Sequence, residues 1–142
     1  MKIGFTGTRN GMLSMQRKKF DIDLDMVQEH SLDPFANEFH HGDCVGADAD
    51  GHDVADEHNF HIVIHPPVKN DLRAWKDGDE VREPNTYFAR NRNIVNETDI
   101  LYACPPTDEE LKKGGTWYTI NYARKVGKPV RIFWPYGRAT HE

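Results

Sequence analysis

The sequence has few cysteines and no long apolar run, and both shortages limit the classes of protein to consider. Cys44 and Cys104 are the only cysteines among 142 residues, and they form no CxxC pair. Two thiols in a chain with no apolar signal region at its start are typical of reduced core or pocket residues, and they argue against a disulfide framework. No apolar run approaches the length of a membrane span. We therefore expect a cytoplasmic protein that does not associate with a membrane.

Several motifs of common nucleotide and metal sites are also absent. The chain has neither the Gly-Lys-Ser/Thr end of a Walker P-loop, nor a GxGxxG dinucleotide fingerprint, nor an HExxH metal motif. Histidines are nevertheless frequent in one part of the chain, at His40, His41, His52, His58, His61 and His65. Because no cysteine pair or metal-binding spacing accompanies them, we interpret them as satisfied histidines and expect neither a metal ion nor a cofactor.

Composition and charge are typical of one compact domain and argue against nucleic-acid binding. The length suits a single domain with its own core, and 37% of the residues are hydrophobic. The 23 acidic residues outnumber the 18 basic ones, for a net charge of −5. A negative chain repels DNA at long range, so nucleic-acid binding is disfavoured. No internal repeat, low-complexity tract or linker interrupts the sequence.

Short strand-like runs alternate with helical stretches along the chain. Strands are expected at residues 2–6, 38–42, 60–65, 99–103 and 129–134. The first helix is expected to be capped by Ser14 and to bury Met15, Phe20, Leu24 and Val27; three more are expected at 47–58, 87–96 and 116–126. The segment 68–86 is expected to be irregular, and the residues from Pro135 on to fray. We predict a doubly wound α/β domain over residues 1–137, with a tail at 138–142.

This alternation predicts where a ligand would bind. Strand–helix units favour a mostly parallel five-stranded sheet with helices on both faces. Right-handed crossovers place all the strand-to-helix loops at one edge of such a sheet, and ligands bind there, near the point where the strand order reverses. The loops that follow the strands are therefore the candidate site.

The first of these loops combines glycine, hydroxyl and guanidinium groups. Gly7 lets the backbone approach a ligand closely, and Thr8 offers a hydroxyl donor. Arg9 offers a planar guanidinium that suits phosphate or carboxylate. A glycine turn with an exposed arginine explains the same residues, so both interpretations stay open here.

The second loop has glycines and carboxylates. Gly42 and Gly46 leave the backbone free to wrap a ligand, and the helix that follows would attract an anion at its N-terminus. Carboxylates repel phosphate, so we interpret Asp43 as a contact to sugar hydroxyls or a base edge, and Asp48 as a helix cap. The alternative is a glycine-rich turn that an aspartate caps.

Two arginines follow the long irregular segment. Arg90 and Arg92 stand two residues apart and therefore point in different directions on a helix. One can reach over the sheet edge while the other anchors the helix. Two solvated arginines are the alternative, which the apolar Ile94-Val95 directly after them weakens.

The last loop predicts a phosphate site. Gly114 and Gly115 precede Thr116 at a helix start, where backbone N–H groups form a nest for phosphate. A loose entry into the helix is the structural alternative. We favour phosphate binding.

Taken together, these motifs resemble the SLOG superfamily, and within it the YspA-like branch. The resemblance runs from Gly4 to Gly137. It is carried by GFTGTR, HGDCVGAD, HPP, the Leu72-Arg73-Ala74 stretch, YFARNRNIV and GGTWYTINYARKVGKPV. The superfamily contains the Lonely Guy phosphoribohydrolases and DNA-processing protein A.

The resemblance implies a Rossmann-like sheet and a nucleotide or nucleotide-derived ligand. The implied pocket consists of Gly7, Thr8, Arg9, Gly42, Asp43, Gly46, Arg90, Arg92, Gly114, Gly115 and Thr116. Superfamily members often self-associate, so the resemblance also suggests a homodimer.

The motifs and the resemblance are compatible with three functions. Binding or sensing of a small nucleotide-like molecule comes first, and a nucleotide N-glycosidase that releases a free base is the alternative. The hydrolase branch follows its PGGxGT loop with a glutamate, whereas here Lys113 replaces the proline and Asn121 stands about where the glutamate would fall. Asp43 and Arg90 are then the candidate catalytic residues. Single-stranded DNA binding is disfavoured, because no basic and aromatic track is present.

Overall fold

Seven strands and four α-helices make up the fold, and the computed structural model describes all 142 residues. The strands are β1 (Lys2–Gly7), β2 (Glu38–His41), β3 (His61–Ile64), β4 (Glu80–Val81), β5 (Ile100–Cys104), β6 (Val130–Phe133) and β7 (Ala139–His141). The helices are α1 (Ser14–Glu29), α2 (Ala47–Glu57), α3 (Tyr87–Glu97) and α4 (Gly115–Lys125), with a short 3-10 turn at Pro34–Ala36. The expected helices and main strands are therefore present.

All strands belong to one sheet in the order β4-β3-β2-β1-β5-β6-β7. Every neighbouring pair is parallel except β6 and β7. From β1 the chain runs outward to β4 and then returns to β5 on the other side of β1, so the strand order reverses between β1 and β5. This arrangement confirms the Rossmann-like α/β class.

The sheet has seven strands where the sequence predicted five. β4 lies in the segment that was expected to be irregular, and it pairs with the end of β3. β7 lies in the tail that was expected to fray; it pairs with β6, and the Glu142 carboxylate accepts two hydrogen bonds from Arg124 at 2.6 and 2.7 Å. Both strands are two or three residues long, too short to show the alternation by which strands are found in a sequence.

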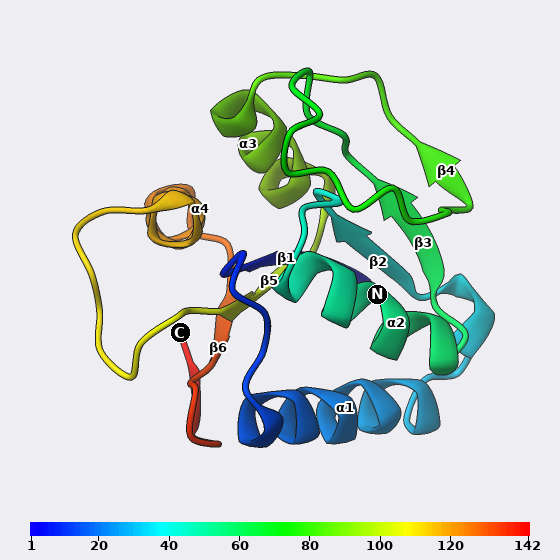
Figure 1. Cartoon of the computed structure of the whole chain (residues 1–142). Helices are drawn as coiled ribbons and strands as arrows, with labels where there is room; N and C mark the ends of the chain where they lie inside the picture. Colours follow the sequence, from blue (N-terminus) through cyan, green and yellow to red (C-terminus); the bar gives the residue numbers. More distant parts are fainter.

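The helices cover both faces of the sheet, with α1 and α2 on one side and α3 and α4 on the other (Figure 1). On the α1–α2 side, the rings of Phe5, Phe20 and Phe39 pack against one another with centroids 5.4–6.0 Å apart. The α3–α4 side has a second apolar cluster around Trp117 and Ile120. A sheet buried on both faces is what parallel strands require.

Helix α1 begins differently from the expectation. Leu13 occupies the N-cap position and Ser14 is the first helical residue, so the predicted serine cap was wrong. The Gln16 side chain accepts a hydrogen bond from the Leu13 N–H and donates to the carbonyls of Pro105 and Phe133 at 3.1 and 2.7 Å. These bonds tie the start of α1 to the ends of β5 and β6. Met15, which was expected to be buried, is 55% exposed.

None of the helices combines the length and the apolar character needed to cross a bilayer.

Candidate functional site

A cleft of about 470 Å³ lies at the carboxyl edge of the sheet, beside the reversal point between β1 and β5. It is bounded by the loops after β1, β2 and β5 and by the first turns of α3 and α4. The residues predicted from the sequence that line it are Gly7, Thr8, Arg9, Gly42, Arg90, Gly114, Gly115 and Thr116. The other three predicted residues, Asp43, Gly46 and Arg92, lie outside its lining.

The loop after β1 packs directly onto the start of α2. The Thr8 N–H donates to the Cys104 carbonyl at 3.0 Å, and the Thr8 carbonyl accepts from the Ala47 N–H at 2.9 Å. Gly46 has φ +90°, and a Cβ there would collide with the backbone of Arg9. Gly46 therefore allows the two loops to pack closely, and the first amide of α2 is already used by the protein.

Arg9 is the free cation of this loop. Its side chain is exposed, lines the cleft, and makes no ion pair within the protein. An unpaired guanidinium at the rim of a cleft is available for a bidentate contact to an anion.

Arg90 lies at the cleft floor, where it joins α3 to the ends of two strands. Its guanidinium Nη1 donates to the Gly42 carbonyl and, at 3.1 Å, to the His65 carbonyl. Its Nε donates to Asn91 Oδ1 at 2.7 Å, and the residue is 4% exposed. A Cβ at Gly42 would collide with this guanidinium. Most Arg90 donors are thus occupied by the protein, and its charge acts on the cleft from below.

Arg92 points away from the cleft, into the seam between α3 and α4. Its Nη1 donates to the Tyr118 hydroxyl at 2.7 Å, and the Tyr118 ring packs on Phe88 with centroids 4.2 Å apart. The two arginines therefore diverge as their helical spacing requires. Arg90 reaches the sheet edge and Arg92 joins the two helices.

Asp43 anchors the long loop that precedes α3. Its carboxylate is fully buried and accepts hydrogen bonds from Arg73 Nε at 2.9 Å and from the Lys76 N–H at 3.0 Å. Its backbone has φ +56°, and its carbonyl accepts from Ala74 at 2.7 Å. This docking holds Leu72 in the cleft wall. Asp43 therefore positions a wall of the cleft, and its carboxylate faces the loop.

Asp48 is the carboxylate that lies in the cleft lining. The helix-cap role predicted for it was wrong, because Gly46 is the N-cap of α2 and no side chain caps this helix. Its Oδ2 accepts a hydrogen bond from the Cys44 N–H, four residues before it, at 3.1 Å. Burial raises the pKa of Asp48 to about 6, and the nearby Arg90 charge partly opposes that rise. The signal in the sequence was its place directly after Gly46-Ala47, where a parallel strand feeds a helix at the binding edge.

The start of α4 is open. Gly114 has φ +107°, and a Cβ at Gly114 or Gly115 would meet nothing within 4 Å. The first turn of a helix leaves its amides without backbone acceptors, so the N–H groups of Gly115, Thr116 and Trp117 are available to an anion. Lys113, just before this turn, is exposed, lines the cleft and has no ion-pair partner.

Aromatic side chains contribute much of the apolar lining of the cleft, and of these only Trp117 was considered from the sequence as a group that could stack on a base. Phe5, Tyr87, Phe88 and Trp117 line it, and Phe88 is 54% exposed. Tyr87 and Phe88 open α3 in the YFARN motif, which brings them to the same edge as the glycine loops. Such rings suit a flat heterocyclic ligand.

Both cysteines are free thiols, as expected. Cys44 lines the cleft and Cys104 is buried beneath it. Burial raises the pKa of both thiols, which makes them poor nucleophiles at neutral pH.

Neither a protein-family model nor a curated protein matches the sequence. Solved structures do match its fold. The molybdenum cofactor binding protein from the phototrophic bacterium Rippkaea orientalis is 19% identical, with a TM-score of 0.68 over 92% of this chain and 74% of that chain. The molybdenum cofactor carrier protein from Chlamydomonas reinhardtii is 17% identical, with a TM-score of 0.62 over 92% and 74% of the two chains.

A third similar structure is DNA processing protein A from Helicobacter pylori, described by its single-stranded DNA binding mode. It is 14% identical, with a TM-score of 0.66 over 93% of this chain and 64% of that chain. At these identities the similarity shows the fold alone. The chain therefore shares the Rossmann-like fold of these proteins.

Proposed function

We propose that this chain is a binding or sensing module for a nucleotide or nucleotide-derived small molecule, and that it belongs to the YspA-like branch of the SLOG superfamily. One observation carries the proposal. The open first turn of α4, the unpaired cations Arg9 and Lys113, and the aromatic rings of α3 line one cleft. A phosphate and a heterocycle on the same small molecule would use both halves.

The phosphate would lie at the start of α4. Three amides converge there, and the partial positive charge of the helix N-terminus favours an anion. Arg9 reaches the cleft from the loop after β1 and Lys113 from the loop before α4. Glycine at position 115 leaves the amides uncovered, since no atom lies within 4 Å of where its Cβ would be.

The heterocycle would lie toward α3. Phe88 is exposed at the cleft, and Leu72 from the docked long loop faces the same space. The cleft volume of about 470 Å³ falls among the sizes typical of small-molecule sites. Two of the structurally similar proteins are described as binding or carrying a cofactor, which supports a small-molecule ligand here as well.

Thermal unfolding with candidate ligands tests the proposal. Nucleoside monophosphates, cyclic nucleotides and ADP-ribose should raise the apparent stability of the full chain by mass action, by about 2.7 kcal/mol at a ligand concentration 100 times Kd. Inorganic phosphate serves as the reference anion. Arg9→Gln and Lys113→Gln should each reduce the shift, whereas Lys18→Gln, on the exposed side of α1, should not. The absence of a shift with every ligand class would overturn the proposal.

A nucleotide N-glycosidase is the second candidate, and Asp48 is the observation that favours it. Asp43, the carboxylate first considered for catalysis, is bonded to the long loop outside the cleft lining. Asp48 lies in the lining with a pKa of about 6, a value at which a carboxyl can donate and accept a proton near neutral pH. Chromatography of nucleoside monophosphates after incubation would detect released base, and Asp48→Asn should abolish the release. If the wild-type chain releases no base, only the binding function remains.

Single-stranded DNA is a weaker candidate for this cleft. The chain carries a net charge of −5, and only three cations, Arg9, Arg90 and Lys113, line the cleft. A gel shift at low salt followed by a salt titration would test it, because phosphate contacts give a steep dependence on salt.

A further inference from the structure

Outside the cleft, four buried histidines form two hydrogen-bonded pairs on opposite faces of β2. On the α2 side, His41 Nε2 lies 2.9 Å from His52 Nδ1. On the α3 side, His40 Nδ1 lies 2.9 Å from His65 Nε2, and these two residues are only 1% and 2% exposed. None of the four lines the cleft. The two pairs have equal separations but different surroundings.

In the pair on the α2 side, the two nitrogens that meet are a matched donor and acceptor. A backbone N–H can only donate, and that of Asp43 lies 2.9 Å from His41 Nδ1, so this nitrogen is the acceptor. The neutral ring of His41 then carries its proton on Nε2 and donates it to His52. No carboxylate lies within ion-pair distance of the His41 or His52 ring, so this pair lacks the acidic ligand that a cation would need.

In the pair on the α3 side, a carboxylate faces the outer nitrogen of His65. Glu38 Oε1 lies 2.8 Å from His40 Nε2, so this nitrogen carries the proton and His40 Nδ1 accepts one from His65 Nε2. His65 Nδ1 then presents a lone pair toward Glu97 Oε2, 3.7 Å away. Two acceptors therefore face one another, an arrangement that a shared cation stabilises.

We infer that His40, His65 and Glu97 form a binding site for a divalent transition-metal ion, with zinc as the best match. Each residue offers one ligand atom, and these atoms all lie within 4.8 Å of one another. Two imidazoles and one carboxylate suit zinc better than magnesium or calcium, which prefer oxygen ligands. Three protein ligands leave a fourth position for water or a substrate atom.

Zinc binding requires a small movement between His65 and Glu97 and a turn of the His40 ring. Zinc binds nitrogen and oxygen at about 2.0–2.2 Å, so two ligands of one tetrahedral ion lie about 3.3–3.5 Å apart. The gap of 3.7 Å between His65 and Glu97 is a few tenths of an ångström wider than that. The His40 ring must turn so that its Nδ1 faces the same point. A ligand set from β2, the residue after β3 and the end of α3 has no regular spacing, which is why the sequence suggested no metal.

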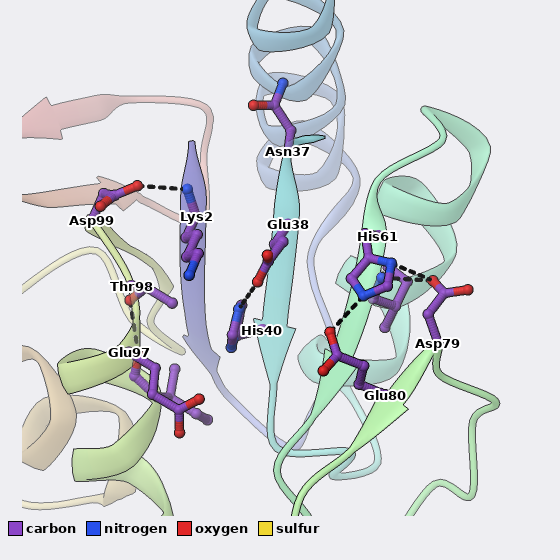
Figure 2. Close-up of polar contacts among 12 residues, drawn as sticks. Lys2, Asn37, Glu38, His40, His61, Asp79, Glu80, Glu97, Thr98 and Asp99 are labelled. Atoms are coloured by element: carbon purple, nitrogen blue, oxygen red, sulfur yellow. Dashed lines mark hydrogen bonds and ion pairs between the residues drawn. The ribbon is translucent and has the colours of Figure 1, made fainter. Parts of the chain in front are cut away.

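Hydrogen bonds already orient the proposed ligands, as is usual around bound metals. Glu38 holds the His40 ring from behind, a contact that Figure 2 shows together with the Glu97 side chain at the end of α3. Arg82 Nε donates to Glu97 Oε1 at 3.0 Å, which leaves Oε2 toward His65. Arg82 also pairs with Glu80 at 3.0 Å. Arg82 thus holds two carboxylates, Glu80 and Glu97, at this end of α3.

The site also has access to solvent. The Glu97 side chain is 37% exposed, so an ion can enter from its side. Once bound, the ion would link the end of α3 to β2 and β3. The proposal is independent of the cleft, because none of the three ligands contacts it.

Zinc binding to the full chain tests the inference directly. After treatment with a chelator, the chain should bind one zinc ion per molecule in equilibrium dialysis, and cobalt in its place should give the strong visible absorption of a tetrahedral site. Glu97→Gln and His65→Gln should each weaken zinc binding by at least about 100-fold, the upper end of what removal of an outer hydrogen-bond partner costs. Glu38→Ala, which removes only such a partner, should weaken it by about 10-fold.

Two control variants separate this site from other histidines. His52→Gln disrupts the His41–His52 pair on the α2 side. His58→Gln removes a more exposed histidine, which also lies beside two carboxylates, Asp21 and Asp25. Both should bind zinc as the wild type does. Absence of stoichiometric zinc, an unchanged affinity in Glu97→Gln, or an equal loss in His52→Gln would each overturn the inference. Glu97 is partly exposed, so its glutamine variant should fold normally and decides the outcome if His65→Gln does not fold.

Discussion

The turn between β2 and α2 and the connection between β5 and α4 both enter a helix through two glycines, yet they are built differently. In the first, protein atoms fill the space beside the glycines: the Arg90 guanidinium lies against Gly42, and the Arg9 backbone lies against Gly46. In the second, nothing lies within 4 Å of where a Cβ would be at Gly114 or Gly115. One wall of the cleft is closed by the protein itself, and the other is open to a ligand.

Because of this difference, substitutions in the two walls should affect different properties, the stability of the fold in one and ligand binding in the other. Groups of the closed wall are bonded to the protein, so changes there should lower the free energy of unfolding. Groups of the open wall have no protein partner, so changes there should affect ligand binding and leave the fold intact. Four substitutions test this separation, beginning with the largest expected effect.

The buried carboxylate of the closed wall should give the largest loss of stability. Asp43→Ala leaves Arg73 without its ion-pair partner and the Lys76 N–H without an acceptor. Breaking a buried pair by removing one partner costs about 3–5 kcal/mol, and this variant should lose about 3 kcal/mol because Arg73 is partly accessible. Urea unfolding measures the loss, with Asp77→Ala in the same loop as the exposed control.

Limited proteolysis gives a second measurement of the same variant. Release of the long loop should make the chain near Arg73 the first site of cleavage. A stability within about 0.5 kcal/mol of the wild type would show that Asp43 does not hold this wall.

Asp48 should give an effect of similar size that depends on pH. Its pKa in the folded chain is about 6, against 3.8 as the ordinary value. The folded state therefore binds this proton more tightly than the unfolded state, and the free energy of unfolding falls as pH rises from about 4 to 6. Two pKa units correspond to about 3 kcal/mol at neutral pH. Asp48→Asn removes this contribution.

Urea unfolding at several pH values compares the two chains. The stability of Asp48→Asn relative to the wild type should rise by up to about 3 kcal/mol between pH 4 and 7. The histidines titrate alike in both chains and cancel in the difference. Parallel pH profiles would mean that the Asp48 carboxylate is solvated.

These two aspartates also show what the sequence could and could not predict. Strand–helix alternation located three helices to within one residue of their ends, and also the start of the first helix, because apolar periodicity reports burial directly. The topology rule for parallel sheets then brought the glycine loops to one cleft. The direction of each side chain in that cleft was not predictable: Asp43 faces the long loop because its φ is +56° and that loop docks beside it. A sequence does not show how an irregular loop docks.

Gly46→Ala should give the next largest loss in the free energy of unfolding. A φ of +90° is unfavourable for alanine, and the added Cβ would collide with the Arg9 backbone. Strain of this kind and overpacking each cost about 1–3 kcal/mol, so we expect a loss of at least about 2 kcal/mol. Chemical unfolding measures it. Gly51→Ala is the useful comparison, because Gly51 is also buried but lies inside α2, and its Cβ would only touch the rings of Phe39 and Phe5 at 3.2 Å or more.

Gly115→Ala should have the smallest effect on the fold and still reduce ligand binding. Gly115 is the first residue of α4, and an added Cβ would meet no protein atom within 4 Å. Alanine there should keep the free energy of unfolding within about 0.5 kcal/mol of the wild type. The methyl group would occupy space next to the amides that we assign to phosphate. Calorimetric titration with the best ligand from the thermal screen should show weaker binding, whereas Ala49→Gly, on α2 outside the cleft lining, should bind normally. If Gly115→Ala keeps full affinity, the phosphate lies elsewhere in the cleft and the open wall has another purpose.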